Sequence, residues 1–194
     1  MARPREFDMD EALSAAMEAF WRRGYEATSL ADLMAAMGLQ KGSIYKAFGD
    51  KHALFLSALQ RYLDQMYEAQ RATLAGAASP RAAIGTWLET LIDAAPAEGT
   101  SCRGCLAVNT LVELGPHDEK ARAILEAHFD RVRQLLIEQL RRGQELGELR
   151  RDVDSGQGAQ LLMTMVGGLL GSLKGATSKS EARRLAQTTL QLLA

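Results

Sequence analysis

Apolar residues recur at spacings of three and four along most of the chain, which is the period of an amphipathic α-helix. Leu and Ala dominate the apolar positions, and β-branched residues are few, which favours helices over sheets. The pattern therefore predicts an all-α protein of nine helices. We place them at about residues 8–23, 29–37, 40–48, 51–74, from 80, from 104, 118–142, 161–173, and from 178.

Residues 28–51 predict two short helices joined by a tight turn. Thr28 or Ser29 can cap the first helix, because a hydroxyl oxygen accepts hydrogen bonds from the free backbone N–H groups. Gly38 ends that helix, since glycine tolerates the left-handed conformation of a sharp turn. Ile44 and Phe48 face inward on the second helix, and a polar set faces outward.

The outward side chains suit a DNA duplex. Lysines neutralise phosphates, hydroxyls donate short-range hydrogen bonds, residues at the front of the helix reach base edges, and a glycine lets the backbone come close. The lysines are Lys41, Lys46 and Lys51, and the hydroxyls belong to Ser43 and Tyr45. Gln40 and Lys41 lie at the front of the helix, and the glycine is Gly42. Helix-turn-helix geometry is also common outside DNA binding, so a helical hairpin with a solvated lysine face is the alternative.

Two segments carry a family resemblance. G-Y-E-A-T-S-L-A-D-L at residues 24–33 and G-L-Q-K-G-S-I-Y-K-A-F-G-D-K-H-A-L-F at residues 38–55 resemble the DNA-binding domain of the TetR family of bacterial transcriptional repressors. The resemblance implies a helix-turn-helix domain over residues 1–50, with Thr28 among its DNA contacts. It also implies a helical effector-binding and dimerisation domain over residues 51–194, and a homodimer that a small-molecule effector releases from a palindromic operator.

Charge and targeting signals agree with a DNA-binding protein that contacts its target locally. The net charge is −1, and basic and acidic residues nearly balance in the first 51 residues, so the positive charge is concentrated in residues 38–51. The N-terminus lacks the apolar core of a signal peptide, and the longest apolar run, residues 161–173, is too short for a bilayer. We expect a cytoplasmic protein without a membrane segment or cofactor.

Residues 161–173 are apolar on more than one face, which is typical of a helix buried on all sides. Gly167, Gly168 and Gly171 would let another helix approach closely. We predict that this helix and the last one form a dimer interface; the alternative is an internal core helix of a monomer. The predicted interface residues are Leu162, Leu169, Leu173, Leu185 and Leu192.

Cys102 and Cys105 form a lone C-x-x-C. A second ligand pair for zinc is missing, and so is the βαβ context of thioredoxin chemistry. A helical, peroxidase-like thiol enzyme is a more serious alternative, but that family places a histidine where this chain has Asn109. We predict instead that Cys105 is a sensor, because a helix start and the neighbouring Arg103 stabilise a reactive thiolate. A small buried hydrophobe is the competing interpretation.

Residues 104–110, G-C-L-A-V-N-T, resemble the start of helix 6 in a TetR branch that senses electrophiles through this cysteine. The resemblance implies that Lys174 is a partner of Cys105. Cys102 is a candidate resolving thiol, and the alternative is an exposed loop residue.

A reversible effector is expected to bind among the central helices of the second domain. An apolar cavity with few polar groups suits an aromatic or drug-like molecule, although each lining residue taken alone is more simply part of the core. The candidates are Tyr62, Met66, Trp87, Cys105, Asn109, Phe129 and Met163.

Overall fold

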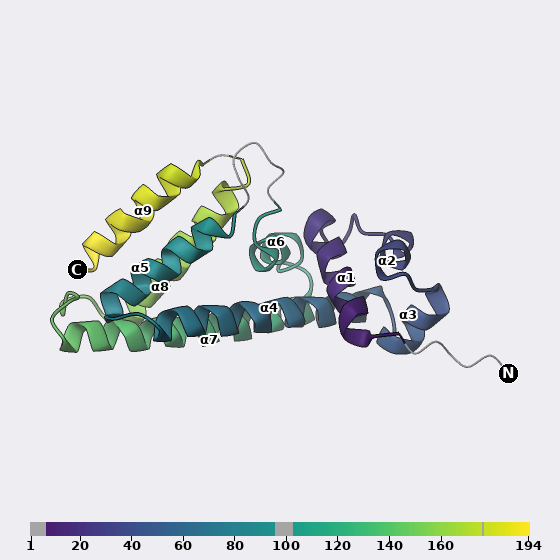
Figure 1. Ribbon diagram of the computed structural model, residues 1–194, viewed down its shortest axis with the longest axis horizontal. Helices are drawn as coiled ribbons and strands as arrows, with labels where there is room; N and C mark the ends of the chain where they lie inside the picture. The colour runs from purple at the N-terminus through teal and green to yellow at the C-terminus, as the bar shows by residue number, and fades with distance from the viewer. Residues whose placement is uncertain (1–6, 96–102, 176) are drawn as a thin grey trace.

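The computed structural model describes residues 7–95, 103–175 and 177–194. These residues form nine α-helices and no strand, which confirms the all-α prediction (Figure 1). The helices are α1 (Met9–Arg23), α2 (Leu30–Met37), α3 (Lys41–Phe48), α4 (Lys51–Ala75), α5 (Pro80–Asp93), α6 (Leu106–Glu113), α7 (Glu119–Glu145), α8 (Ser155–Ser172) and α9 (Lys179–Leu192).

The helices form a small head and a larger body. Helices α1, α2 and α3 make the head at one end, while α5, α8 and α9 gather at the other end (Figure 1). The long helices α4 and α7 pack against each other and run between the two ends. Helix α6 lies between the head and the body, so it is placed to contact both.

Side-chain caps explain where several helices begin. Asp8, Asp50 and Asp118 each accept hydrogen bonds from the first backbone N–H groups of α1, α4 and α7. Ser29 and Ser178 form capping boxes with the acidic residue three positions later. Helix α2 ends at Gly38, whose φ of 64° and ψ of 23° are left-handed, and this geometry turns the chain into α3.

The core of the head continues into the body. Phe20 of α1 packs edge-on against Phe55 of α4 with ring centroids 5.1 Å apart, and Leu33 and Ile44 are fully buried in the same cluster. That cluster also contains Leu106 of α6, as well as Cys105, Leu114, Ala121 and Leu125. The head therefore shares a continuous apolar core with α6 and the beginning of α7.

A second core fills the body and corrects part of the predicted dimer interface. Leu162, Leu169 and Leu173 pack inside this cluster and are buried within one protomer, so they cannot face a partner. Leu185 and Leu192 are exposed, at 53% and 60% of their surface. On α8 the exposed leucine is Leu161, the neighbour of the buried Leu162, and 48% of its surface is exposed. Adjacent positions of a helix point about 100° apart, so one can be exposed while the next is buried.

In the part of the chain that the structure describes, no helix combines the length and the apolar character needed to cross a membrane.

Candidate DNA-binding and effector sites

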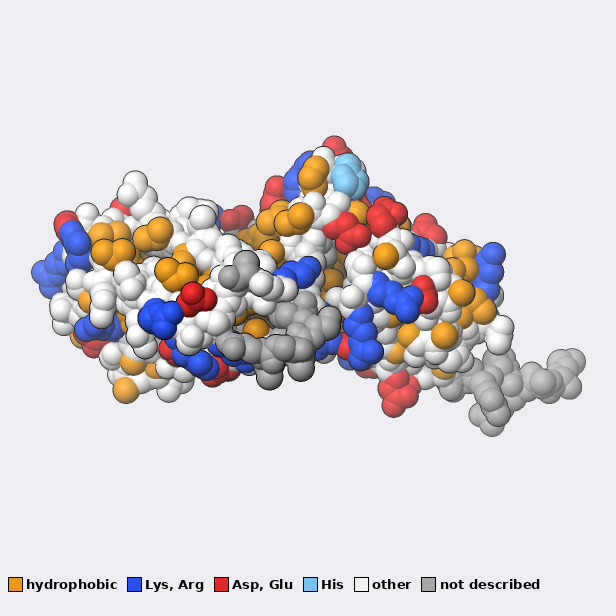
Figure 2. All heavy atoms as spheres, turned by 90° about the horizontal axis from the view of Figure 1, so that it is seen from above, with side chains coloured by type: hydrophobic (Ala, Val, Ile, Leu, Met, Phe, Trp, Pro, Cys, Tyr) orange, Lys and Arg blue, Asp and Glu red, His pale blue; other side chains and the backbone are white. Residues whose placement is uncertain are grey.

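Helix α3 presents the predicted polar set to solvent. Ile44 is completely buried and fixes the helix against the head, which leaves the opposite face free. Gln40, which is the N-cap, and Lys41, Gly42, Tyr45 and Lys46 are exposed, and Ser43 is partly buried. Basic and acidic side chains are intermixed over the part of the head visible in Figure 2, so the surface there has no large patch of one sign.

The three predicted phosphate-binding lysines differ in their surroundings. The Lys41 ammonium lies 5.5 Å from the Tyr45 ring centroid, and the Lys51 ammonium lies 4.3 Å from the Tyr25 ring centroid. Lys51 is only partly exposed. Lys46 is exposed and forms no ion pair within the described residues. Lys46 is therefore the α3 cation that is most available to a phosphate.

Thr28 has a structural position. Its side chain is fully buried, and its hydroxyl donates a 2.6 Å hydrogen bond to the carbonyl oxygen of Gly24. Ser29, not Thr28, caps α2. The Thr28 hydroxyl thus holds the turn before α2 and is not displayed to a duplex.

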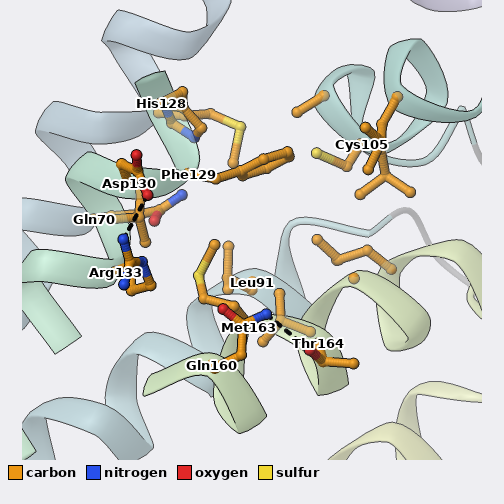
Figure 3. A pocket seen from close by; sticks show the side chains of 18 of the residues that line it. Gln70, Leu91, Cys105, His128, Phe129, Asp130, Arg133, Gln160, Met163 and Thr164 are labelled. Atoms are coloured by element: carbon orange, nitrogen blue, oxygen red, sulfur yellow. Dashed lines mark hydrogen bonds and ion pairs between the residues drawn. The ribbon is translucent and has the colours of Figure 1, made fainter. Parts of the chain in front are cut away.

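A cavity of about 480 Å³ lies among α4, α5, α6, α7 and α8 (Figure 3). Its walls are mostly apolar. Five predicted effector contacts line it, namely Met66, Trp87, Cys105, Phe129 and Met163. The other two, Tyr62 and Asn109, do not line the cavity. Tyr62 lies behind Cys105, and Asn109 faces a separate cleft beside Trp21 and Lys174.

Two buried polar side chains form one end of this cavity. His128 is 5% exposed, and its Nδ1 has no hydrogen-bond partner within the described residues. Gln70 is 8% exposed, and its Oε1 accepts a 3.3 Å hydrogen bond from the Trp87 indole. Figure 3 shows both on the opposite side of the cavity from Cys105.

Cys105 is the N-cap of α6 and is 8% exposed. Its sulfur accepts a hydrogen bond from the Tyr62 hydroxyl at 3.5 Å. Burial, together with the adjacent Cys105, raises the pKa of Tyr62, which keeps that hydroxyl protonated as a donor. Cys105 thus belongs to the head core and to the cavity wall at once.

The predicted partners of Cys105 are engaged elsewhere. The Arg103 guanidinium stacks 3.6 Å from the Trp21 ring centroid and pairs with Glu18. Lys174, just beyond the end of α8, donates a 3.1 Å hydrogen bond from Nζ to Asn109 Oδ1. Cys102 lies outside the described residues, as does any contact it makes.

One end of α6 is hydrogen-bonded to the last turn of α1, and the other end to the turn that follows α1. The Trp21 indole N–H donates to the carbonyl oxygen of Gly104 at 2.8 Å. At the other end, the Glu113 carboxylate accepts from the backbone N–H groups of Tyr25 and Glu26 at 3.1 and 2.9 Å. These bonds, which we call the α6 latch, tie the cavity wall directly to the head.

Comparison with known proteins decides the family. Residues 12–58 match the bacterial regulatory proteins of the tetR family, and residues 76–189 match a tetracyclin repressor-like C-terminal domain. The chain belongs to the TetR family. It is a DNA-binding transcriptional regulator, which confirms the resemblance found in residues 24–55.

Individual TetR relatives cover nearly the whole chain. The transcriptional repressor ComR of Escherichia coli strain K12 is 31% identical over 191 residues, 98% of this chain and 90% of ComR. A cysteine mutant of the regulator CifR, solved with 26 bp double-strand operator DNA, is 34% identical over 100% of both chains, with a TM-score of 0.86. Reduced NemR of E. coli, 22% identical with a TM-score of 0.87 over 95% of this chain and 96% of its own, shares the fold. ComR and CifR are regulators, so the thiol-enzyme alternative is not favoured.

Sequence reasoning missed the polar residues that line this cavity. Gln70 follows Leu63 and Met66 at helical spacing, and His128 falls between Leu125 and Val132. Each is a polar residue at a position that the period assigns to a buried face. A search for such interruptions of an apolar stripe would have found both. The described residues contain no cluster of side chains suited to a metal ion.

The burial of His128 predicts a pH effect on stability. Burial, with a smaller contribution from the charge of Arg131, lowers the pKa of His128 from 6.5 to about 4, and Asp64 opposes the shift. Between these values the unfolded chain binds a proton at this position and the folded protein does not, so the free energy of unfolding falls as the pH falls. When the pH falls from 7 to 5, we expect the free energy of unfolding of His128→Phe to decrease by roughly 2 kcal/mol less than that of the wild type. Urea unfolding at both pH values measures this difference. His117→Phe, at an exposed histidine, is the control, and equal losses in His128→Phe and wild type would contradict the assignment.

Proposed function

We propose that this TetR regulator is a repressor that binds a palindromic operator as a homodimer, with α3 of each subunit in a major groove. In this proposal residues 1–50 bind DNA and residues 51–194 sense the effector and dimerise. The observation that carries it is the solvent-exposed polar face of α3, held out by the buried Ile44. The 34% identical CifR was solved with operator DNA, which supports the same use of this helix. A regulator of chromosomal genes acts where the chromosome lies, in keeping with the expected cytoplasmic location.

The residues of α3 have distinct expected roles. Gln40 and Lys41, at the front of the helix, are placed to reach base edges, while Lys46, Tyr45 and Ser43 contact phosphates. Gly42 has nothing within 4 Å of the position where a Cβ would stand, so the duplex backbone can come close there. Lys51 contributes positive charge from the beginning of α4.

Replacing Lys46 tests the groove contact. We expect Lys46→Ala to weaken binding to all duplexes and to flatten the plot of log affinity against log salt by about 2 for a dimer, because each lost phosphate contact removes about 0.9 from the slope. Fluorescence anisotropy of labelled operator at several salt concentrations measures the slope. Arg141→Ala removes an exposed cation of α7 as the control. A Lys46→Ala slope equal to that of the control would remove Lys46 from the phosphate contacts.

Helices α8 and α9 are the proposed dimer surface. Leu161, Leu185 and Leu192 are exposed on these helices, and Gly168 and Gly171 leave open space where a Cβ would stand. Exposed leucines beside open glycines suit the close packing of two copies as a four-helix bundle.

Introducing a charge on this surface tests the proposed dimer interface. We expect Leu185→Glu to sediment as a monomer at concentrations where the wild type is a dimer, because a carboxylate would be buried in an apolar contact. Met9→Glu, at an exposed apolar residue of α1, is the control. Dimeric Leu185→Glu would place the interface elsewhere.

Cys105 is the proposed chemical switch within the effector cavity. An oxidant such as hydrogen peroxide converts its thiol to a sulfenic acid and is itself reduced to water. An α,β-unsaturated carbonyl compound instead forms an S–C bond at its β-carbon, and the thiol proton ends on its α-carbon. Either product enlarges a group packed in the head core at the N-cap of α6.

Displacement of α6 would then reach DNA through two routes. The first is helix α4, whose Tyr62 donates to the Cys105 sulfur. The second is the α6 latch, which joins α6 to α1 without passing through α4. Movement of the heads alters the spacing of the two α3 helices and releases the operator, with a coupling typically of about 1–3 kcal/mol.

Substitution of the thiol tests the switch. Cys105→Ser should bind DNA from upstream of its own gene as tightly as the wild type, yet stay bound in peroxide that releases the wild type, since a serine hydroxyl is not oxidised under these conditions. Anisotropy with and without peroxide measures both states. Release of Cys105→Ser by peroxide would refute the switch. Wild-type binding that ignores peroxide would leave the repressor with a reversible effector instead.

One bond of the α6 latch can be removed without altering the thiol. Trp21→Phe keeps an aromatic ring against Arg103 but removes the N–H donor to Gly104. We expect the ratio of operator affinities between reduced and peroxide-treated protein to fall about fivefold, the equivalent of one hydrogen bond. Arg22→Ala, which loses only an ion pair with Glu18, should keep the wild-type ratio. An unchanged ratio in Trp21→Phe would show that the Trp21–Gly104 bond does not carry the coupling.

A further inference from the structure

We propose that His128 and Gln70 form a polar subsite that recognises the hydroxyl group of an uncharged, largely aromatic effector, such as a phenol. The inference rests on the proposed effector cavity and adds the chemical class of a reversible ligand. It is carried by two buried polar side chains at one end of an otherwise apolar cavity (Figure 3).

His128 has an unused hydrogen-bonding atom. The side chain sits on the buried face of α7, between Leu125 and Val132, and its ring is 5.7 Å from that of Phe129. Its Nδ1 is buried and has no partner within the described residues. The other ring nitrogen, Nε2, also makes no hydrogen bond within the described residues and is not fully buried, so it is the atom that a ligand in the cavity can reach.

Gln70 adds a donor with a fixed direction. Because the Trp87 N–H can only donate, it holds the Gln70 oxygen toward the indole. The amide nitrogen then points away from Trp87, and Figure 3 shows it directed toward the cavity. This nitrogen makes no hydrogen bond within the described residues.

A hydroxyl suits this pair better than a carboxylate does. A neutral imidazole carries one donor and one acceptor, and an amide nitrogen carries donors only. A hydroxyl can accept from Gln70 and donate to His128. The low pKa of His128 leaves it uncharged at neutral pH, so it cannot serve as the counter-ion of an anion. The lining residues Asp130 and Arg133 pair with each other at 2.7 Å and supply no free charge.

The remaining walls fit an aromatic body. Trp87, Phe129, Met66, Met163 and Leu170 surround the space beyond the polar end. Ring faces and thioethers pack favourably on aromatic ligands. A volume of about 480 Å³ is within the range for a small organic molecule.

Three matched probes test the subsite: 2-naphthol, naphthalene and 2-naphthoate. Equilibrium dialysis of the reduced protein gives each dissociation constant. For the wild type we expect 2-naphthol to bind about tenfold more tightly than naphthalene and 2-naphthoate to bind more weakly than 2-naphthol. His128→Phe and Gln70→Met should each reduce the preference for 2-naphthol over naphthalene to about twofold while naphthalene affinity stays near wild type. Gln139→Met, the same change at a buried glutamine of α7 outside the cavity, should keep the tenfold preference. Circular dichroism confirms that each variant is folded.

Three results would overturn the subsite. Equal wild-type affinity for 2-naphthol and naphthalene would show that no hydroxyl is recognised, and a preference that survives both His128→Phe and Gln70→Met would place the recognition elsewhere. Binding of no probe by the wild type also overturns it. Operator binding by the wild type, measured separately, reports on the proposed repressor function, so the two failures are distinguishable.

Discussion

The hydrogen bonds that join α6 to α1 are the constraint on which the rest of this molecule depends. Helix α6 is only eight residues long, which is too short to be stable alone. It is held in place because its first residue, Leu106, and its C-cap, Leu114, are buried, and because both its ends are hydrogen-bonded to the head. The same helix supplies Cys105 and Ala107 to the cavity wall. These bonds therefore couple rearrangement of the cavity wall to the head, and such coupling is the physical requirement for communication between two sites.

The cavity is where the sequence departs from what stability alone would select. A leucine at the position of Gln70 or His128 would continue the apolar stripe of α4 or α7 without a polar atom to satisfy. Burial lowers the pKa of His128, so the folded protein keeps this side chain neutral. Of the Gln70 amide, only the oxygen has a hydrogen-bond partner within the described residues. Polar groups held in this state favour a function in recognition, since local rules of foldability tend to be broken at functional sites.

Local signals in the sequence were sufficient for the helices and for the surface of α3. Gly38, the Ser178 capping box and the apolar period each act within one helical turn, so their consequences can be deduced from neighbouring residues. The orientation of α8 could not be deduced, because Leu161 and Leu162 are adjacent in an all-round apolar helix and only tertiary packing decides which one faces inward. Tyr62 and Asn109 were misplaced for the same reason. The helices that carry them were predicted, but the sequence did not show which face of each helix lines the cavity.

The two proposed modes of release converge on one element. A modified Cys105 sulfur pushes on α6 from its N-cap, and a ligand seated at His128 and Gln70 extends toward the same wall from the opposite side of the cavity (Figure 3). Because Cys105 is 8% exposed and lines the cavity, a reagent that enters there must first fit a space shaped for an apolar body. In this proposal, reactivity and shape selection are combined at one site, and α6 would convert either event into a displacement of the head.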